Sequence, residues 1–387
     1  MANTTLSDIC IGGGSYGIAA SGVDFSSDLP TYLRITDIKD DGTVDMTSLK
    51  SVDDKNSWKY KLKPNDIVFA RTGASTGRNY FYDVRDGEFV YAGFLIKFSI
   101  DPKKANPLFV KYYCKTESYW GWVQAFDTGG TRGNINAKDL GNMPIPIVPR
   151  EQQDFLAEVL SSLDDRIRSL KQQNEILEAL AQTYFRKWFL EENKNDPIPV
   201  SDIATLENNS VNPGRQPLES FYHYSIPAFD NSQTPAVELG KAILSNKFCV
   251  LPNTILVSKL NPVTPRIWRI GEKVQPNSVC STEFQVLKPK DMRHYLFLYC
   301  LMKSKDVVAS FAMSATGTSG SHQRIRPEYI LEVETPAPDD EKLALFNEVC
   351  APMMERVKKN QKQILTLQKL RDTLLPKLIS GEVRVKQ

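Results

Sequence analysis

The stretch Leu62-Lys63-Pro64-Asn65-Asp66-Ile67-Val68 recurs later in the chain as Val250-Leu251-Pro252-Asn253-Thr254-Ile255-Leu256. The two stretches share a Pro-Asn pair and the apolar residues that follow it. At the same offset of 188 residues, Arg71, Thr76 and Arg78 fall on Lys259, Thr264 and Arg266. An offset of 190 relates 177–180 to 367–370. The 387-residue chain is therefore predicted to hold two copies of one domain, related by pseudo-twofold symmetry.

Each copy has the same internal order of predicted elements. Short β-branched and aromatic runs come first, and they predict strands such as 66–70, 94–98 and 255–257. A helical patch follows, at 108–123 and 295–311, and then a Pro-rich exit, at 143–149 and 334–338. A long helix begins beyond each exit. The fold class is therefore α+β, with two strand-rich domains and two long helices.

These patterns divide the chain into five parts. The first domain takes residues 1–150 and its long helix takes 151–190. A polar, Pro-containing linker is predicted at 191–199. The second domain takes 200–339, and the second long helix with a C-terminal tail takes 340–387.

Both long helices carry apolar residues at three- and four-residue spacing, which is typical of a coiled-coil seam. In the second helix this pattern has one break, at Pro352. Asn174 and Asn360 occupy opposite seam positions, which predicts that they meet in an antiparallel pair. Helices of ~30–35 residues at ~1.5 Å per residue would be ~45–50 Å long. At about 3.4 Å per base pair, that separates the two domains by roughly 13–15 base pairs of DNA.

Charge and cysteine content restrict the classes of protein only weakly. Forty-eight Lys and Arg against 46 Asp and Glu leave a net charge of +2, which neither demands nor excludes nucleic acid. The six cysteines are scattered without a C-x-x-C pair, so we expect free thiols rather than disulfides or a zinc site. Neither a signal peptide nor a run of about 20 apolar residues is evident. We therefore expect a soluble cytoplasmic protein.

No catalytic or metal-binding constellation is predicted. Gly12–Gly17 matches G-x-G-x-x-G but lacks the following helix of a dinucleotide site, so a flexible turn is expected. Asp66 with Asp101-Pro102-Lys103 resembles a metal nuclease pattern only faintly, and the second copy has Thr254 in place of Asp66. His223 is expected to be structural, and His322 lies in a polar loop.

Two loops in each copy have the composition of a DNA contact. They span 71–78 and 128–134 in the first copy, and 259–266 and 316–324 in the second. Arginine binds guanine edges, hydroxyls bind phosphate, and glycine allows close approach. Because the copies differ most in these loops, we expect two different half-sites. The predicted DNA-binding residues are Arg71, Thr72, Ser75, Thr76, Arg78, Thr131, Arg132, Asn134, Lys259, Asn261, Thr264, Arg266, Thr318, Ser319, Ser321, His322 and Arg324.

The chain resembles the specificity subunits of type I restriction–modification enzymes over nearly its whole length. The resemblance rests on Leu62–Gly77, Gly129–Ile135, Pro144–Gln152 and Leu375–Val383. It implies a non-catalytic chain of a host-defence system, with two target-recognition domains that read the halves of a bipartite site in double-stranded DNA. It also implies that the helices dock two methyltransferase subunits, which use S-adenosylmethionine, and that restriction (motor-nuclease) subunits join them. No cofactor is expected on this chain itself.

Two alternatives remain. The chain could be a DNA methyltransferase or nuclease with an unrecognised site in one module, or a coiled-coil scaffold that does not bind DNA. In the first case the purified chain alone would modify DNA. In the second, affinity for DNA would be insensitive to salt, because no phosphate contacts would release counterions.

Overall fold

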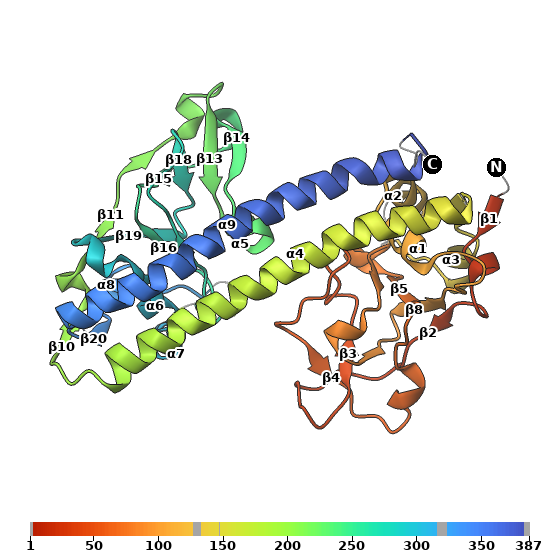
Figure 1. Ribbon diagram of the computed structural model, residues 1–387, viewed down its shortest axis with the longest axis horizontal. Helices are drawn as coiled ribbons and strands as arrows, with labels where there is room; N and C mark the ends of the chain where they lie inside the picture. Colours follow the sequence, from red (N-terminus) through yellow and green to blue (C-terminus); the bar gives the residue numbers. More distant parts are fainter. Residues whose placement is uncertain (1–2, 127–132, 147, 316–322, 383–387) are drawn as a thin grey trace. The chain divides into compact units, whose positions relative to one another are not determined.

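The computed structural model describes residues 3–126, 133–146, 148–315 and 323–382. Two compact units make up the chain. Unit 1 comprises residues 1–169 and 363–387, and unit 2 comprises 170–362. The long helices α4 (Arg150–Phe185) and α9 (Asp340–Ile379) each contribute one segment to each unit (Figure 1).

Unit 1 is built on a four-stranded antiparallel sheet in the order β2-β8-β5-β6. Every residue of its inner strand β5 is buried, as expected for the apolar run 67–70, and Asp66 at its start is buried as well. A second sheet has the order β4-β3-β7, with β3 and β7 parallel, and β1 pairs with β9. The strands are β1 (Asn3–Thr5), β2 (Ser15–Tyr16), β3 (Thr31–Leu33), β4 (Lys50–Ser51), β5 (Asp66–Ala70), β6 (Asn79–Phe81), β7 (Phe89–Tyr91), β8 (Leu95–Ser99) and β9 (Pro144–Pro146).

Three short helices cover the first sheet of unit 1. They are α1 (Pro107–Tyr113), α2 (Glu117–Gln124) and α3 (Ala137–Gly141), and the side chains of Asn106, Thr116 and Asn136 cap their N-termini. Side chains from β5, β8 and α1 form one core with Leu156 and Leu160 of α4. Leu375 and Leu378 of α9 complete this core.

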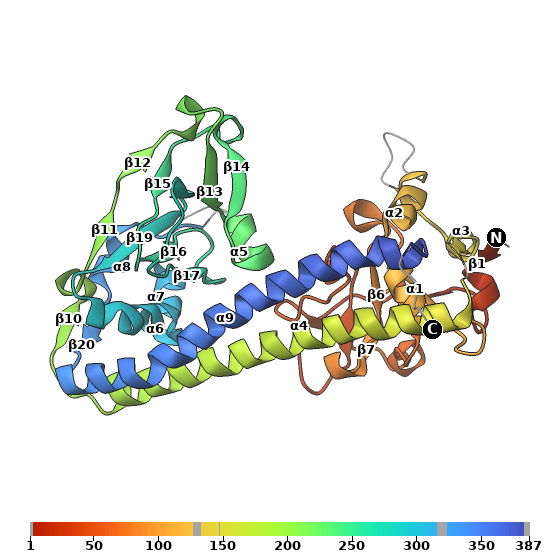
Figure 2. The ribbon, with the colours of Figure 1, turned by 45° about the horizontal axis from the view of Figure 1, so that its top comes forward.

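Unit 2 repeats this plan with a four-stranded sheet in the order β11-β19-β16-β17. Its second sheet is larger and has the order β12-β15-β18-β13-β14, with β13 and β18 parallel. Figure 2 labels the strands β12, β13, β14 and β15 of this sheet. The strands are β10 (Pro197–Pro199), β11 (Ala204–Glu207), β12 (Ser210–Val211), β13 (Ser220–Tyr224), β14 (Ala236–Leu239), β15 (Lys247–Cys249), β16 (Ile255–Ser258), β17 (Ile267–Arg269), β18 (Ser278–Cys280), β19 (Phe284–Pro289) and β20 (Glu334–Pro336).

The helices of unit 2 close over a core rich in aromatic residues. They are α5 (Ile226–Ser232), α6 (Tyr295–Lys303), α7 (Lys305–Ser314) and α8 (Glu328–Glu332). Beyond Phe185, α4 continues as a π-helical segment, Arg186–Glu191. Phe185 and Phe189 from this end of α4 pack on Phe297 of α6 and Phe346 of α9 with edge-to-face ring contacts.

The backbone of the repeated Pro-Asn stretch explains why both copies keep it. Asn65 and Asn253 have φ angles of 71° and 55°, in the left-handed region that asparagine tolerates better than most residues. Each turn leads directly into the buried strand that ends at a predicted DNA-contacting loop, β5 or β16. The conserved turn therefore sets where each of these strands begins.

Within unit 2, the C-terminal part of α4 and the N-terminal part of α9 run antiparallel. Asn360 Nδ2 donates a hydrogen bond to Asn174 Oδ1 at 2.9 Å, so the two asparagines meet as their seam positions predict. Leu177 and Val357, the neighbouring pair in this register, belong to the same apolar core. Asn360 is 1% exposed, and its amide also lies 3.5 Å from Gln173 Oε1.

The second long helix is continuous through Pro352, as its predicted extent requires, and residues Phe346, Cys350 and Met354 around the proline pack into the core. Two other expectations differ from the structure. The predicted linker 191–199 contains β10, which pairs with β20. The turn at 12–17 is open at Gly12 and Gly13 but packed at its end, since a Cβ on Gly17 would lie 2.2 Å from the Ala92 carbonyl oxygen.

Candidate nucleic-acid interface

In unit 1, the backbone joins the two predicted DNA-contacting loops. The first loop, 71–78, follows β5, and Ile135 N donates to Arg71 O at 2.9 Å. Thr72 and Asn134 form an antiparallel bridge beside this bond. Thr76 Oγ1 donates to Gly73 O at 2.7 Å and contacts Gly133 O at 2.9 Å. The hydroxyl of Thr76 therefore stabilises the junction of the two loops.

The side chain of Arg71 is oriented by an aromatic ring. Its guanidinium carbon lies 5.2 Å from the centroid of the Tyr16 ring, a cation–π distance. Tyr16 is itself fixed, because its hydroxyl accepts a hydrogen bond from Ala137 N at 3.1 Å. Within the described residues, the buried Arg71 Nε has no hydrogen-bond partner. Arg71 is thus a positioned cation whose hydrogen-bonding capacity is not fully used.

The other end of the first loop is turned toward its own domain. Arg78 Nε forms an ion pair with Asp40 at 2.6 Å, and Ser75 is buried. Gly77 has a φ of 86°, and a Cβ there would lie 2.5 Å from Val123 of α2. Glycine is therefore required for packing here, as well as for any approach to a ligand.

Unit 2 reproduces the backbone junction with different side chains. Ile325 N donates to Lys259 O at 3.1 Å, and Leu260 bridges Arg324 just as Thr72 bridges Asn134. Asn261 N donates to Gln323 O at 2.9 Å, and the φ of Asn261 is 49°. The two units therefore present the same strand–loop frame, whereas the residues at the matching positions differ.

Two arginines of this second interface are held by carboxylates. Arg266 contacts both oxygens of Asp230, at 2.7 and 2.8 Å. Arg324 pairs with Glu283 at 2.9 Å, and this hydrogen bond raises the pKa of Arg324. Thr264 is exposed, and its N–H donates to Asn261 O at 3.0 Å.

The remaining predicted contact residues lie outside the described part of the chain. They are Thr131, Arg132, Thr318, Ser319, Ser321 and His322. Their DNA contacts stay predictions.

The sequence patterns missed Tyr16 and the three carboxylates that pair with the loop arginines. Tyr16 lies in the glycine-rich segment 12–17, whose pattern resembles a dinucleotide motif and does not indicate a contact with Arg71. Asp40, Asp230 and Glu283 are 38, 36 and 41 residues from their partners, so no local pattern relates them.

The residues considered for chemistry have structural partners. Asp66 accepts from Ser99 Oγ at 2.5 Å and pairs with Lys97 at 3.3 Å, and Asp101 accepts the Lys103 N–H of a turn. His223 Nδ1 lies 2.8 Å from Glu238. In the described ranges, no three His, Cys, Asp or Glu residues gather as a metal site would require. The helices described here include none with the length and apolar character needed to cross a membrane.

Comparisons with known proteins agree with this two-unit plan. Residues 18–179 match the family model described as "Type I restriction modification DNA specificity domain". The type I restriction enzyme MjaIX specificity subunit of Methanocaldococcus jannaschii is 28% identical over 318 residues, which cover 72% of this chain and 69% of that protein. The type I restriction enzyme HindI specificity subunit of Haemophilus influenzae is 24% identical over 159 residues, covering 40% of this chain and 33% of that protein.

A solved structure extends the likeness in fold to almost the whole chain. The type I restriction–modification S subunit from M. genitalium superposes with a TM-score of 0.57 at 19% sequence identity. The match covers 97% of this chain and 95% of that one. The solved S subunit is therefore similar to this chain in fold, and residues 18–179 are similar in sequence to the type I restriction–modification DNA specificity domain.

Proposed function

We propose that this chain selects the DNA sequence for a type I restriction–modification complex and carries no catalytic site of its own. Unit 1 reads one half of a bipartite site in double-stranded DNA, and unit 2 reads the other. Methyltransferase subunits, which bind S-adenosylmethionine, supply the chemistry of modification. Two such subunits dock on the long helices, and restriction subunits complete the assembly.

The duplicated loop junction is the observation that carries this proposal. In both units, a buried inner strand delivers a cationic residue, Arg71 or Lys259, to a loop that is hydrogen-bonded to a second loop. A rigid sheet thus holds two loops together at one edge, and a site built on a rigid scaffold can discriminate between bases.

The two half-sites are expected to differ. Arginine can contact guanine O6 and N7 through two parallel hydrogen bonds, whereas lysine offers a single flexible ammonium group. Arg71 is stacked on Tyr16, while the matching residue of unit 2 is Lys259. Different side chains on the same frame favour an asymmetric recognition sequence.

Reconstitution with the methyltransferase subunits of the same system tests this function. With S-adenosylmethionine, the assembled complex should methylate DNA at one bipartite sequence, and the purified chain alone should not. DNA affinity should fall steeply as salt rises, because phosphate contacts release counterions. Methylation by the isolated chain would instead favour a catalytic role, and salt-independent affinity would favour a scaffold.

Single substitutions test which unit reads which half. Arg71→Ala should relax the base preference in one half-site, and Lys259→Ala should affect the other. Arg132→Ala and Arg324→Ala should each weaken DNA binding by the complex. Lys103→Ala is the matched control, because Lys103 is exposed and follows the opposite end of β8 from the loops. Equal effects of Lys103→Ala and Arg71→Ala would contradict the assignment.

A further inference from the structure

The two copies place a lysine at the same point of the fold, but its surroundings differ. Lys115 precedes Thr116, the N-cap of α2, and Lys303 precedes Ser304, the N-cap of α7. In unit 2, Lys303 Nζ forms an ion pair with Glu178 of α4 and lies 3.1 Å from the Tyr299 hydroxyl. Although burial opposes the charge, these partners raise the pKa of Lys303. The lysine of unit 2 is therefore fully paired.

In unit 1, the residues that match these partners cannot pair with a cation. Gln368 matches Glu178 at the offset of 190, and Lys111 matches Tyr299 at the offset of 188. Lys115 forms no ion pair within 4.0 Å of any described residue, and its aromatic contact is the Tyr112 ring at 5.9 Å. Burial lowers its pKa to about 8, despite the attraction of Asp164.

Other cations already pair with three of the carboxylates near Lys115. Asp164 accepts from Arg371 at 3.0 Å and from the Tyr112 hydroxyl at 2.9 Å, and it pairs with Lys111 at 3.2 Å. Asp40 pairs with Arg78 at 2.6 Å, and Asp372 pairs with Arg371 at 2.9 Å. The ammonium group of Lys115 is thus the cation that this cluster does not neutralise by direct contact.

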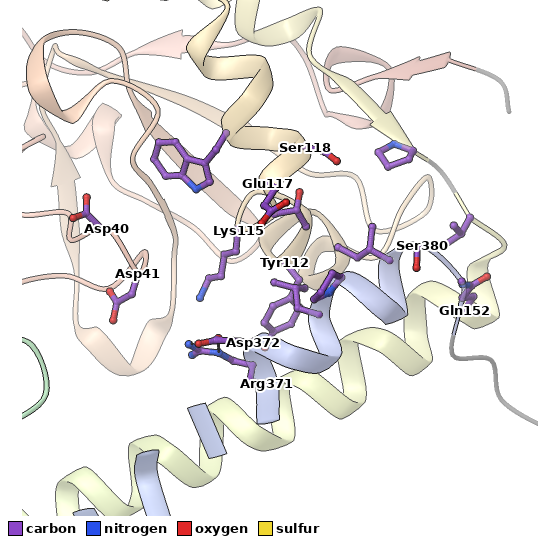
Figure 3. Close-up of a pocket in the computed structure, with 18 of the residues that line it drawn as sticks. Asp40, Asp41, Tyr112, Lys115, Glu117, Ser118, Gln152, Arg371, Asp372 and Ser380 are labelled. Atoms are coloured by element: carbon purple, nitrogen blue, oxygen red, sulfur yellow. Dashed lines mark hydrogen bonds and ion pairs between the residues drawn. The ribbon is translucent and has the colours of Figure 1, made fainter. Parts of the chain in front are cut away.

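Lys115 projects into a pocket of about 1360 Å³ in unit 1. Figure 3 shows its side chain between the loop of Asp40 and Asp41 and the end of α9 that carries Arg371. Apolar surface lines much of the remainder, from Trp120, Val148, Leu375, Ile379 and the prolines 146, 149 and 376. A cation on an apolar wall fits an anionic group with an apolar neighbour.

The corresponding part of unit 2 contains an anionic group with apolar neighbours. There the carboxylate comes from Glu178, and aromatic rings at Phe185 and Phe189 stand where unit 1 has the smaller Leu375 and Ile379. Unit 2 therefore supplies its own carboxylate and rings from α4. Unit 1 has neither at the matching positions of α9.

We propose that the unit 1 pocket binds a carboxylate side chain, flanked by an apolar residue, from a protein subunit that assembles with this chain. The carboxylate pairs with Lys115 as Glu178 pairs with Lys303. The apolar neighbour packs against Trp120 and Leu375. This inference rests on the proposed function, because it requires a partner subunit.

Amine labelling of the full-length chain tests the pocket directly. An acylating reagent at pH 8 should modify Lys115 rapidly in the isolated chain, because about half of a population with a pKa near 8 is neutral at that pH. After assembly with the methyltransferase subunits, labelling of Lys115 should fall at least tenfold. Lys303 should react slowly in both states. Unchanged labelling of Lys115 on assembly would overturn the proposal.

Substitution provides a second readout with an internal control. Lys115→Met should weaken assembly at least tenfold while the isolated chain still folds, because the half-buried Lys115 forms no ion pair with a described carboxylate. Lys303→Met should lower the melting temperature of the isolated chain, because it leaves Glu178 unpaired. Assembly by Lys115→Met within twofold of the wild-type affinity would overturn the proposal.

Two further outcomes distinguish a wrong ligand assignment from a wrong proposed function. If inorganic phosphate or DNA without any subunit protects Lys115 from labelling, the pocket takes a phosphate and the carboxylate assignment is wrong. If the wild-type chain does not assemble with methyltransferase subunits at all, the proposed function itself is refuted, and this inference with it.

Discussion

The hydrogen bond between Asn174 and Asn360 can be measured as a coupling energy. Asn360 is 1% exposed and donates to Asn174 at 2.9 Å, whereas Asn174 is half-buried. Asn174→Ala leaves a buried amide without its main acceptor, which costs about 1–3 kcal/mol. Asn360→Ala leaves a group that water can reach, so we expect a smaller cost of about 1 kcal/mol. Replacing both by leucine should be nearly neutral or stabilising, because no polar group is then stranded.

Urea unfolding followed by circular dichroism gives the four free energies of unfolding for a double-mutant cycle. We expect the two alanine substitutions to be coupled by about 0.5–3 kcal/mol, the range seen for residues in contact. Ile176→Ala is the control on the same helix, since Ile176 is 66% exposed and should change stability by less than about 0.5 kcal/mol. If the costs of the two single alanine variants sum to the cost of the double variant within about 0.3 kcal/mol, the claim that this pair contributes as a unit is refuted.

Three other substitutions test the packing and electrostatics of the units. Phe346→Ala should destabilise unit 2 by about 3–5 kcal/mol, because Phe346 is fully buried among Phe185, Trp188 and Phe189; a loss below about 1 kcal/mol in urea unfolding would contradict this core. Gly17→Ala should lower the melting temperature, because its Cβ would meet the Ala92 carbonyl oxygen at 2.2 Å, whereas Gly13→Ala, with open space around it, should not; equal melting temperatures would contradict the close approach. Burial opposes the charge of Asp164, but Lys115, Lys111 and Arg371 lower its pKa from 3.8 to about 2. The charged form therefore contributes about 2 kcal/mol above pH 4, and this contribution is lost as the pH falls toward 2. The melting temperature of Asp164→Asn should lie below that of the wild type above pH 4, and this difference should shrink as the pH falls toward 2. A difference that stays constant would assign the effect of Asp164 to hydrogen bonding instead.

The sequence was sufficient for features that depend on local pattern or on the repeat. The run 66–70, apolar after Asp66, predicted β5 at its observed bounds, and the repeat predicted a second strand at β16. The seam positions of Asn174 and Asn360 indicated their contact, because helical periodicity fixes which side chains share a face.

Features that depend on tertiary neighbours were not predictable. The sequence predicted one long helix despite Pro352, but it did not show the apolar packing on either side of that proline. Likewise, the loop compositions did not reveal that Arg78, Arg266 and Arg324 have carboxylate partners, since those carboxylates lie on remote segments. Composition identified the candidate loops, but the orientation of each side chain required the structure.

The division of α4 and α9 between the two units has a consequence for how the protein is made. Unit 2 is one continuous stretch, 170–362, and its core residues are all present before synthesis ends. The core of unit 1 includes Leu375 and Leu378, which the ribosome adds only after all of unit 2. Domains usually fold as units with the N-terminal one first. Here the first domain to emerge is the last that can close, so a nascent chain arrested after residue 362 would have an open core in unit 1.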